Sequence, residues 1–168
     1  MSDHDETASD QIFDLKAELP APKDEAERHL ILALDQLAQK VDSLLASGHP
    51  FPEAELHHVF ELKSVVMDSP QASMIFVLVL MKLGESNVQN DMLTDMIDRM
   101  GFLPPFLFYK ALALAKLERV PEALDWLQRL IGTGVKNYEL FMLAARWKRQ
   151  LKDDRGAISM MNLAIYEN

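Results

Sequence analysis

The residues of this chain that could do chemistry are few, and the best placed lie in one short stretch. Glu53, His57 and Glu61 recur every four residues, a spacing that puts two carboxylates and an imidazole on one helix face, where they could bind a divalent metal. His57 and His58 point about 100° apart on a helix, so they cannot both bind one ion. Such a row is more often a solvated helix surface. We therefore expect no metal ion, and a metal-dependent activity is only the third hypothesis for function.

Other signatures of catalysis are missing from the sequence. The chain has no cysteine, which excludes disulfides, thiolate zinc sites and cysteine nucleophiles. Gly132-Thr133-Gly134 lies between two predicted helices without a preceding strand, so it is interpreted as a loop and not as a phosphate site. No nucleophile elbow, P-loop or dinucleotide fingerprint occurs. The sequence predicts a protein that is not an enzyme and needs no cofactor.

Negative charge is concentrated at the N-terminus. The 168 residues carry a net charge of −9, and residues 1–28 hold nine acidic against three basic side chains. An acidic chain is a poor ligand for nucleic acid or an anionic membrane, and the longest apolar run, Met74–Met81, is too short to insert across a bilayer. We expect a disordered acidic arm over residues 1–23, a single helical domain over 24–168, and a cytoplasmic location.

Helical periodicity dominates the rest of the chain. One apolar stripe, at spacings of four and three, predicts a long helix over Asp24–Ser47; it consists of Leu30, Leu34, Leu37, Val41 and Leu44. A second helix should run from Pro52 to about Met67. These two elements form the divergent N-terminal part of the domain, residues 24–70.

From residue 71 onward the pattern repeats every 34 residues. Lys82-Leu83, Lys116-Leu117 and Gln150-Leu151 are each followed by a short polar turn, with an amphipathic stretch on either side. The spacing predicts three helix–turn–helix units over 71–104, 105–137 and 138–168. The competing interpretation is an ordinary helical bundle whose helices are of similar length.

Small residues recur at the same period. Ala111 and Ala145 stand in the first helices of the last two units, and Ala123 and Ala157 in the second helices, each pair 34 apart. In this the chain resembles the tetratricopeptide repeat (TPR) family, although Val77 and Gln89 replace the small residues of the first unit. The resemblance implies an all-α fold, with antiparallel helix pairs stacked as a right-handed superhelix.

The resemblance also implies a concave groove lined by the first helix of each unit. Its lining would be apolar, rich in methionine, and cationic at the C-terminal end, which suits a hydrophobic or amphipathic segment of a client protein. The residues that the resemblance places there are Met74, Ile75, Leu78 and Met81 in the first unit, Phe108, Tyr109 and Leu112 in the second, and Met142, Leu143, Arg146 and Arg149 in the third.

Three alternatives compete with an open groove. A phase error of one or two residues would turn these side chains into interior packing. The helix over Asp24–Ser47 could itself fill the groove. The basic cluster near the C-terminus could be a solvated face neutralised by neighbouring acids; it consists of Arg146, Lys148, Arg149, Lys152 and Arg155.

The last predicted helix carries apolar residues on more than one face. Ile158, Met161 and Ile165 would form an apolar edge, which predicts a docked partner or a homodimer.

The groove leads to the first hypothesis, a non-catalytic adaptor or chaperone that holds a client there. In length, acidity and repeat number the chain also resembles the small TPR chaperones of type III secretion. The alternative is a scaffold subunit that assembles through its C-terminal edge.

Overall fold

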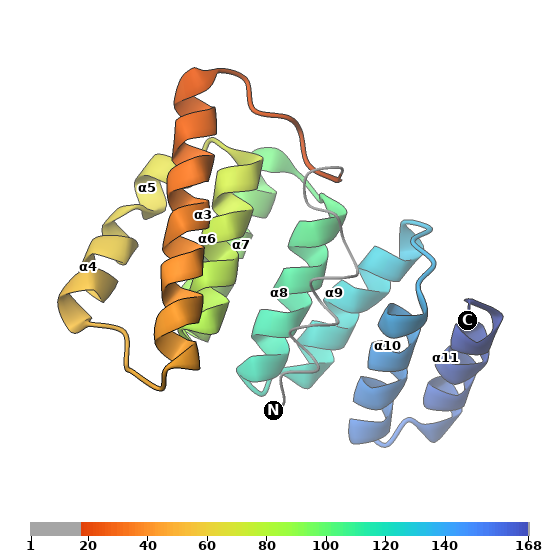
Figure 1. The fold of residues 1–168 in the computed structure, drawn as a ribbon. Helices are drawn as coiled ribbons and strands as arrows, with labels where there is room; N and C mark the ends of the chain where they lie inside the picture. The colour runs from red at the N-terminus through yellow and green to blue at the C-terminus, as the bar shows by residue number, and fades with distance from the viewer. Residues whose placement is uncertain (1–17, 168) are drawn as a thin grey trace. The chain divides into compact units, whose positions relative to one another are not determined.

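A computed structural model describes residues 18–167 of the chain, and every regular element in that part is a helix (Figure 1). The all-α fold predicted from the sequence is confirmed. The described residues form two compact units that meet in the sequence between Leu103 and Pro104. Most of the predicted acidic arm, up to residue 17, lies outside the described residues.

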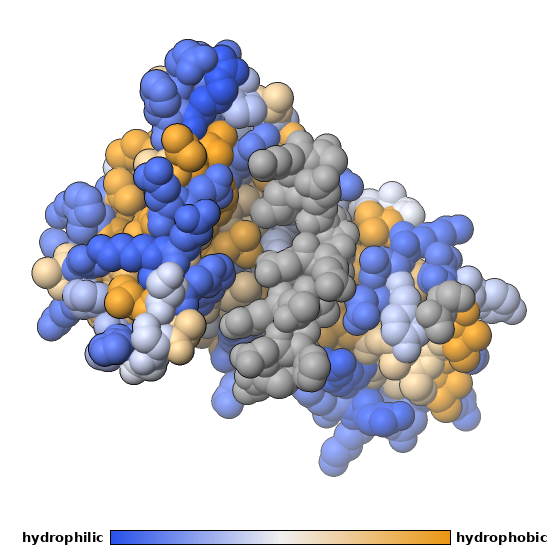
Figure 2. Space-filling view, in the orientation of Figure 1, coloured by the Kyte–Doolittle hydropathy of each residue, from blue (hydrophilic) through white to orange (hydrophobic). Residues whose placement is uncertain are grey.

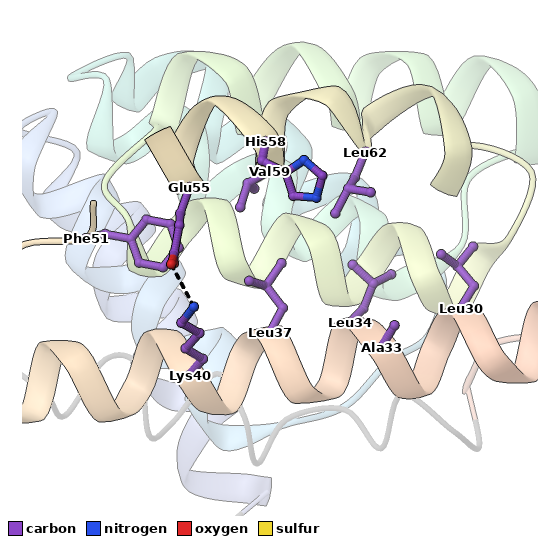
Figure 3. A pocket seen from close by; sticks show the side chains of 10 residues that line it. All are labelled: Leu30, Ala33, Leu34, Leu37, Lys40, Phe51, Glu55, His58, Val59 and Leu62. Carbon is purple, nitrogen blue, oxygen red and sulfur yellow. Dashed lines mark hydrogen bonds and ion pairs between the residues drawn. The ribbon is translucent and has the colours of Figure 1, made fainter. Parts of the chain in front are cut away.

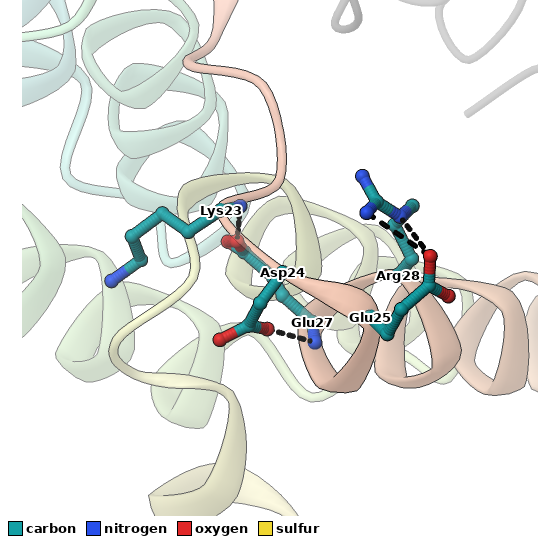
Figure 4. A network of polar contacts seen from close by, with 5 residues as sticks. All are labelled: Lys23, Asp24, Glu25, Glu27 and Arg28. Carbon is teal, nitrogen blue, oxygen red and sulfur yellow. Dashed lines mark hydrogen bonds and ion pairs between the residues drawn. The ribbon is translucent and has the colours of Figure 1, made fainter.

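The N-terminal unit begins with a long helix whose start is well capped. The Asp24 side chain accepts a hydrogen bond from the amide of Glu27 at 2.9 Å, and Glu25 pairs with Arg28 in the first turn (Figure 4). An aspartate in this position satisfies an amide that has no partner within the helix. The helices of this unit are α3 (Glu25–Ala46), α4 (Glu53–Glu61), α5 (Lys63–Val66), α6 (Pro70–Lys82) and α7 (Ser86–Met100).

The predicted long helix agrees with α3, but the second predicted helix is divided. Instead of running to Met67, it stops at Glu61 and resumes at Lys63. At Leu62 the amide donates to the carbonyl of Val59, three residues back, at 3.0 Å. This tighter turn interrupts the α-helical hydrogen bonding.

Helix α3 packs against α6 (Figure 1). Leu34 and Val41 of its apolar stripe are buried. Asp42 of α3 forms an ion pair with Lys82 of α6, with 2.8 Å between Oδ1 and Nζ. Near the other end of α6, the Gln71 side chain donates to the carbonyl of Pro20 at 3.1 Å. The segment that leads into α3 therefore contacts one end of α6, and α3 itself pairs with the other end.

The C-terminal unit consists of two helix pairs. Helices α8 and α9 form the first pair and α10 and α11 the second, and α9 also packs on α10. The small residues predicted at the crossings, Ala111, Ala123, Ala145 and Ala157, are all buried. The bounds are α8 (Pro104–Lys116), α9 (Val120–Gly132), α10 (Tyr138–Gln150) and α11 (Asp154–Glu167).

The 34-residue period is present in the backbone itself. The first helices start at Pro70, Pro104 and Tyr138, and the second helices at Ser86, Val120 and Asp154. Each first helix ends in a Schellman turn, in which an amide bonds back across the last turn of the helix. The residue in the left-handed conformation is Gly84 (φ 76°), Glu118 (φ 61°) and Lys152 (φ 62°) in turn.

Candidate protein-binding surfaces

Glu53, His57 and Glu61, whose spacing alone would allow them to share a metal ion, are all exposed. His57 Nε2 lies 3.3 Å from Glu61 Oε1, and both side chains are more than half exposed. The row is on α4, whose outer face it follows. Within residues 18–167, no group of three or more histidine or acidic side chains is arranged to hold a metal ion.

On α6, the predicted groove residues fall into two groups. Met74 and Met81 are buried, whereas Ile75 and Leu78 are partly exposed. Ile75 and Leu78 lie on the stripe that joins Gln71 to Lys82, because the spacings of four, three and four keep all of them on one helix face. Both ends of that stripe bond to the segment that carries α3. Helix α3 therefore lies along the α6 face predicted to line the groove.

On α8, the predicted residues are mostly interior. Phe108 and Tyr109 are each only 1% exposed and meet edge to face, with ring centroids 5.2 Å apart. Leu112 is partly exposed. A partner could reach Leu112 directly, but it could reach the two aromatic rings only if their neighbours moved.

Helix α10 carries the most accessible part of the predicted groove. Met142 and Leu143 are partly exposed, and Arg146 and Arg149 are exposed. Because these positions recur at spacings of three and four, they lie along neighbouring rows of one helix. The helix thus presents an apolar patch followed by two cations, in the order predicted.

The charges around this region are partly paired. Lys148, whose side chain is only 13% exposed, lies 3.6 Å from an oxygen of Asp153. On α9, Trp126 has Lys110 and Arg129 over its ring, at 5.8 and 4.7 Å from the centroid. A double hydrogen bond from Arg119 lowers the pKa of Glu122 from its ordinary value.

The predicted C-terminal edge is open. Ile158 is 54% exposed and Ile165 69%, while Met161 is partly exposed. Figure 2 shows hydrophobic residues on the surface of α11. Ala157 and Ala164 of the same helix are buried, and they mark the side that packs on α10.

An apolar cleft between α3 and α4 was not foreseen from the sequence. Its volume is about 370 Å³, and an ion pair between Lys40 and Glu55, 2.8 Å long, closes one end (Figure 3). The leucine stripe of α3 indicates a buried face, but it does not show that α4 leaves a space between the two helices. The lining residues are Leu30, Ala33, Leu34, Leu37, Lys40, Phe51, Glu55, His58, Val59 and Leu62.

No helix in the described part of the chain combines the length and apolar character needed to cross a bilayer. No protein-family model matches the sequence, and no curated protein matches it.

Solved structures do match the fold. The structure titled MamA AMB-1 superposes with a TM-score of 0.57 at 16% identity, over 82% of this chain and 86% of that one. The structure titled MamA MSR-1 superposes with a TM-score of 0.59 at 15% identity, over 97% and 88%. At this identity the likeness is one of fold. The chain has the TPR-like helical repeat fold seen in MamA.

Proposed function

We propose that this protein is a non-catalytic adaptor or chaperone of the cytoplasm, which binds a hydrophobic or amphipathic segment of a client protein along α8 and α10. The observation that carries the proposal is the surface of α10, where the partly exposed Met142 and Leu143 stand beside the exposed Arg146 and Arg149. A TPR-like fold supports a role in protein interaction or scaffolding. The predicted repeat units 105–137 and 138–168 would present this surface.

The proposed site is shorter than the groove expected from the sequence. Because α3 packs along α6, we leave Ile75 and Leu78 out of the client site and assign them to contact with α3. The buried Phe108 and Tyr109 of α8 serve as support beneath the surface, and the buried Met74 and Met81 of α6 are left out of the site. The remaining contact residues are Leu112, Met142, Leu143, Arg146 and Arg149.

The chemistry of this surface indicates the kind of client. Unbranched methionine side chains adapt to apolar groups of different shape, and two arginines would bind an acidic flank of the same segment. Each apolar anchor that a client buries contributes about 1.5–3 kcal/mol before ordering costs. Two or three anchors would therefore give affinities around micromolar.

The test is co-purification of the tagged full chain from its own cells. Leu112→Glu and Met142→Glu should each release the client, because a carboxylate would replace an apolar anchor. Leu163→Glu is the matched control: it makes the same kind of change at an exposed leucine of α11 (43% exposed), away from the proposed site. Circular dichroism of each variant checks folding. A client that stays bound to both groove variants would overturn the proposal.

A second candidate function is a scaffold subunit that docks through α11. The exposure of Ile158 and Ile165 favours it, since isolated apolar residues are common on surfaces but a stripe of them marks a contact. In the same co-purification, Ile165→Glu distinguishes the two functions. Loss of the partner from this variant, with retention by Leu112→Glu and Met142→Glu, would assign binding to the edge.

A further inference from the structure

The exposed face of α11 corresponds, by repeat position, to a face of α9 that is largely buried. Leu124 of α9 and Ile158 of α11 are 34 residues apart and occupy the same repeat position. Leu124 is 8% exposed, whereas Ile158 is 54% exposed. The difference follows from the neighbours: α10 packs on α9, but within the described residues no further helix packs on α11.

The same comparison holds for the rest of the face. Leu127 of α9 is fully buried, and its counterpart Met161 is partly exposed. Ile131 is partly exposed, and its counterpart Ile165 is 69% exposed. The face made by Ile158, Met161 and Ile165, which we call the α11 face, therefore has the polarity of a helix-packing surface that no helix of residues 18–167 covers.

The surface of this chain offers one helix that matches the α11 face. In the described part, α11 carries more exposed large apolar residues than any other helix, and two of them, Ile158 and Ile165, lie on the α11 face. From Gly156 to Tyr166 the helix has no charged side chain. Two copies of α11 can thus approach without bringing like charges into a low-dielectric contact.

We propose that the α11 face pairs with the α11 face of a second copy in an antiparallel, two-fold contact. The proposal rests on the second candidate function and names its partner. The apolar stripe is nearly symmetric about Met161 and Asn162. In an antiparallel pair, Ile158 therefore faces Ile165 of the other copy. Met161 then lies beside the two-fold axis, level with Asn162 of the other copy and one residue along the helix from its own equivalent. A two-fold contact of this kind buries the same patch on both molecules.

The orientation of the pair decides which charged residues meet at the ends of α11. Asp154 and Arg155 stand at the N-terminus of α11, and Glu167 at its C-terminus. A parallel pair would place each of these residues beside its own copy, with like charges opposed. The antiparallel pair instead brings Arg155 of one copy to the end where Glu167 of the other lies, so that one of these contacts is between opposite charges, and it also suits the helix dipoles.

Engineered cysteines test this register, because the native chain has no cysteine to form background disulfides. In the full-length protein, Met161→Cys should form a disulfide-linked dimer on mild oxidation, and so should the double variant Ile158→Cys with Ile165→Cys. Ile158→Cys alone should not, because its partner is residue 165 of the other copy. Leu163→Cys, on the opposite side of α11, is the control for chance collision.

Sedimentation equilibrium gives the affinity without cross-linking. The wild-type chain should be in monomer–dimer exchange in the micromolar range, and Ile165→Glu should weaken the dimer by at least about tenfold. Leu163→Glu should leave it unchanged. Since Ile165 and Leu163 are both exposed, neither variant should unfold the chain, and circular dichroism checks this.

Three outcomes would overturn the proposal: a wild-type monomer at hundreds of micromolar, a dimer unaffected by Ile165→Glu, or a Leu163→Cys variant that cross-links as efficiently as Met161→Cys. Failure of the scaffold function can be told apart from failure of the self-pairing by combining the dimer measurement with the co-purification. If the wild type is monomeric but Ile165→Glu still releases a cellular partner, the edge binds another protein and only the self-pairing is wrong. If the dimer forms but no partner depends on Ile165, the self-pairing stands and the scaffold function does not.

Discussion

Glu118 and Lys152 end the first helices of two repeats in the left-handed conformation that Gly84 adopts in the repeat before them. The hydrogen bonds are the same in each turn: for Glu118, the next amide bonds to the carbonyl of Leu114 at 2.9 Å. Only glycine takes this conformation without a penalty from its side chain. Glu118→Gly should therefore stabilise the protein.

The size of the effect follows from two opposing contributions. A left-handed conformation costs a residue with a Cβ roughly 1–2 kcal/mol. Glycine removes this cost, but it also gives the unfolded chain more conformational freedom, which lowers the free energy of unfolding by about 0.4–1 kcal/mol. The exposed Glu118 side chain has few contacts to lose, so we expect a net gain of about 0.5–1 kcal/mol. For a chain of this length that raises Tm by about 1–4 °C.

Urea denaturation and calorimetry measure this change. Glu118→Ala is the control, because it removes the charge but keeps the Cβ, and it should give no comparable gain. Gly84→Ala should lose about 0.5–1 kcal/mol, from the same two contributions with opposite sign. A Cβ built at Gly84 has no atom within 4 Å, so that loss would come from the backbone and not from a clash. If Glu118→Gly is no more stable than Glu118→Ala, the conformational argument is refuted.

Three other predictions concern packing and charge. Gln89 is fully buried and neither polar atom of its side chain has a partner within the described residues, so Gln89→Leu should raise the free energy of unfolding by about 1–2 kcal/mol in urea; a loss would show that the amide is satisfied. Leu78→Glu should release α3 from α6, seen as faster hydrogen exchange in α3 with exchange in α8–α11 unchanged. Because the hydrogen bond from Arg119 lowers the folded-state pKa of Glu122, the stability it adds is present above the ordinary pKa and is lost as pH falls through the lowered value. Arg119→Gln should return the pKa of Glu122 to its ordinary range in an NMR titration, and an unchanged pKa would show that Arg119 is not the cause.

The helix pairs were predictable because their signals are local. Turns and apolar spacing recur every 34 residues, and hydrogen bonds within a few residues decide where a helix ends. The division at Leu62 escaped prediction because neither proline nor glycine marks it.

The sequence was a poorer guide to which residues of the predicted groove are exposed. Helix α6 is apolar from Met74 to Met81 without interruption, and a helix that is apolar all round gives no sign of which face meets which neighbour. The leucine stripe of α3 shows that one side is covered, but the partner, α6, is set by tertiary packing. On α11 the apolar residues wrap around more than one face, and the structure buries Ala157 and Ala164 while Ile158 and Ile165 stay exposed.

Burial also divides the methionines of this cysteine-free chain by their exposure to oxidants. Met74, Met92 and Met96 are fully buried, whereas Met142 and Met161 are partly exposed. Oxidation to the sulfoxide makes the side chain polar, and it proceeds first where sulfur is accessible. Mild oxidative stress would therefore modify the surfaces of α10 and α11, and the partly exposed Met100 at the end of α7, while the helical interior stays reduced. Methionine sulfoxide reductases could reverse such a change without unfolding the protein.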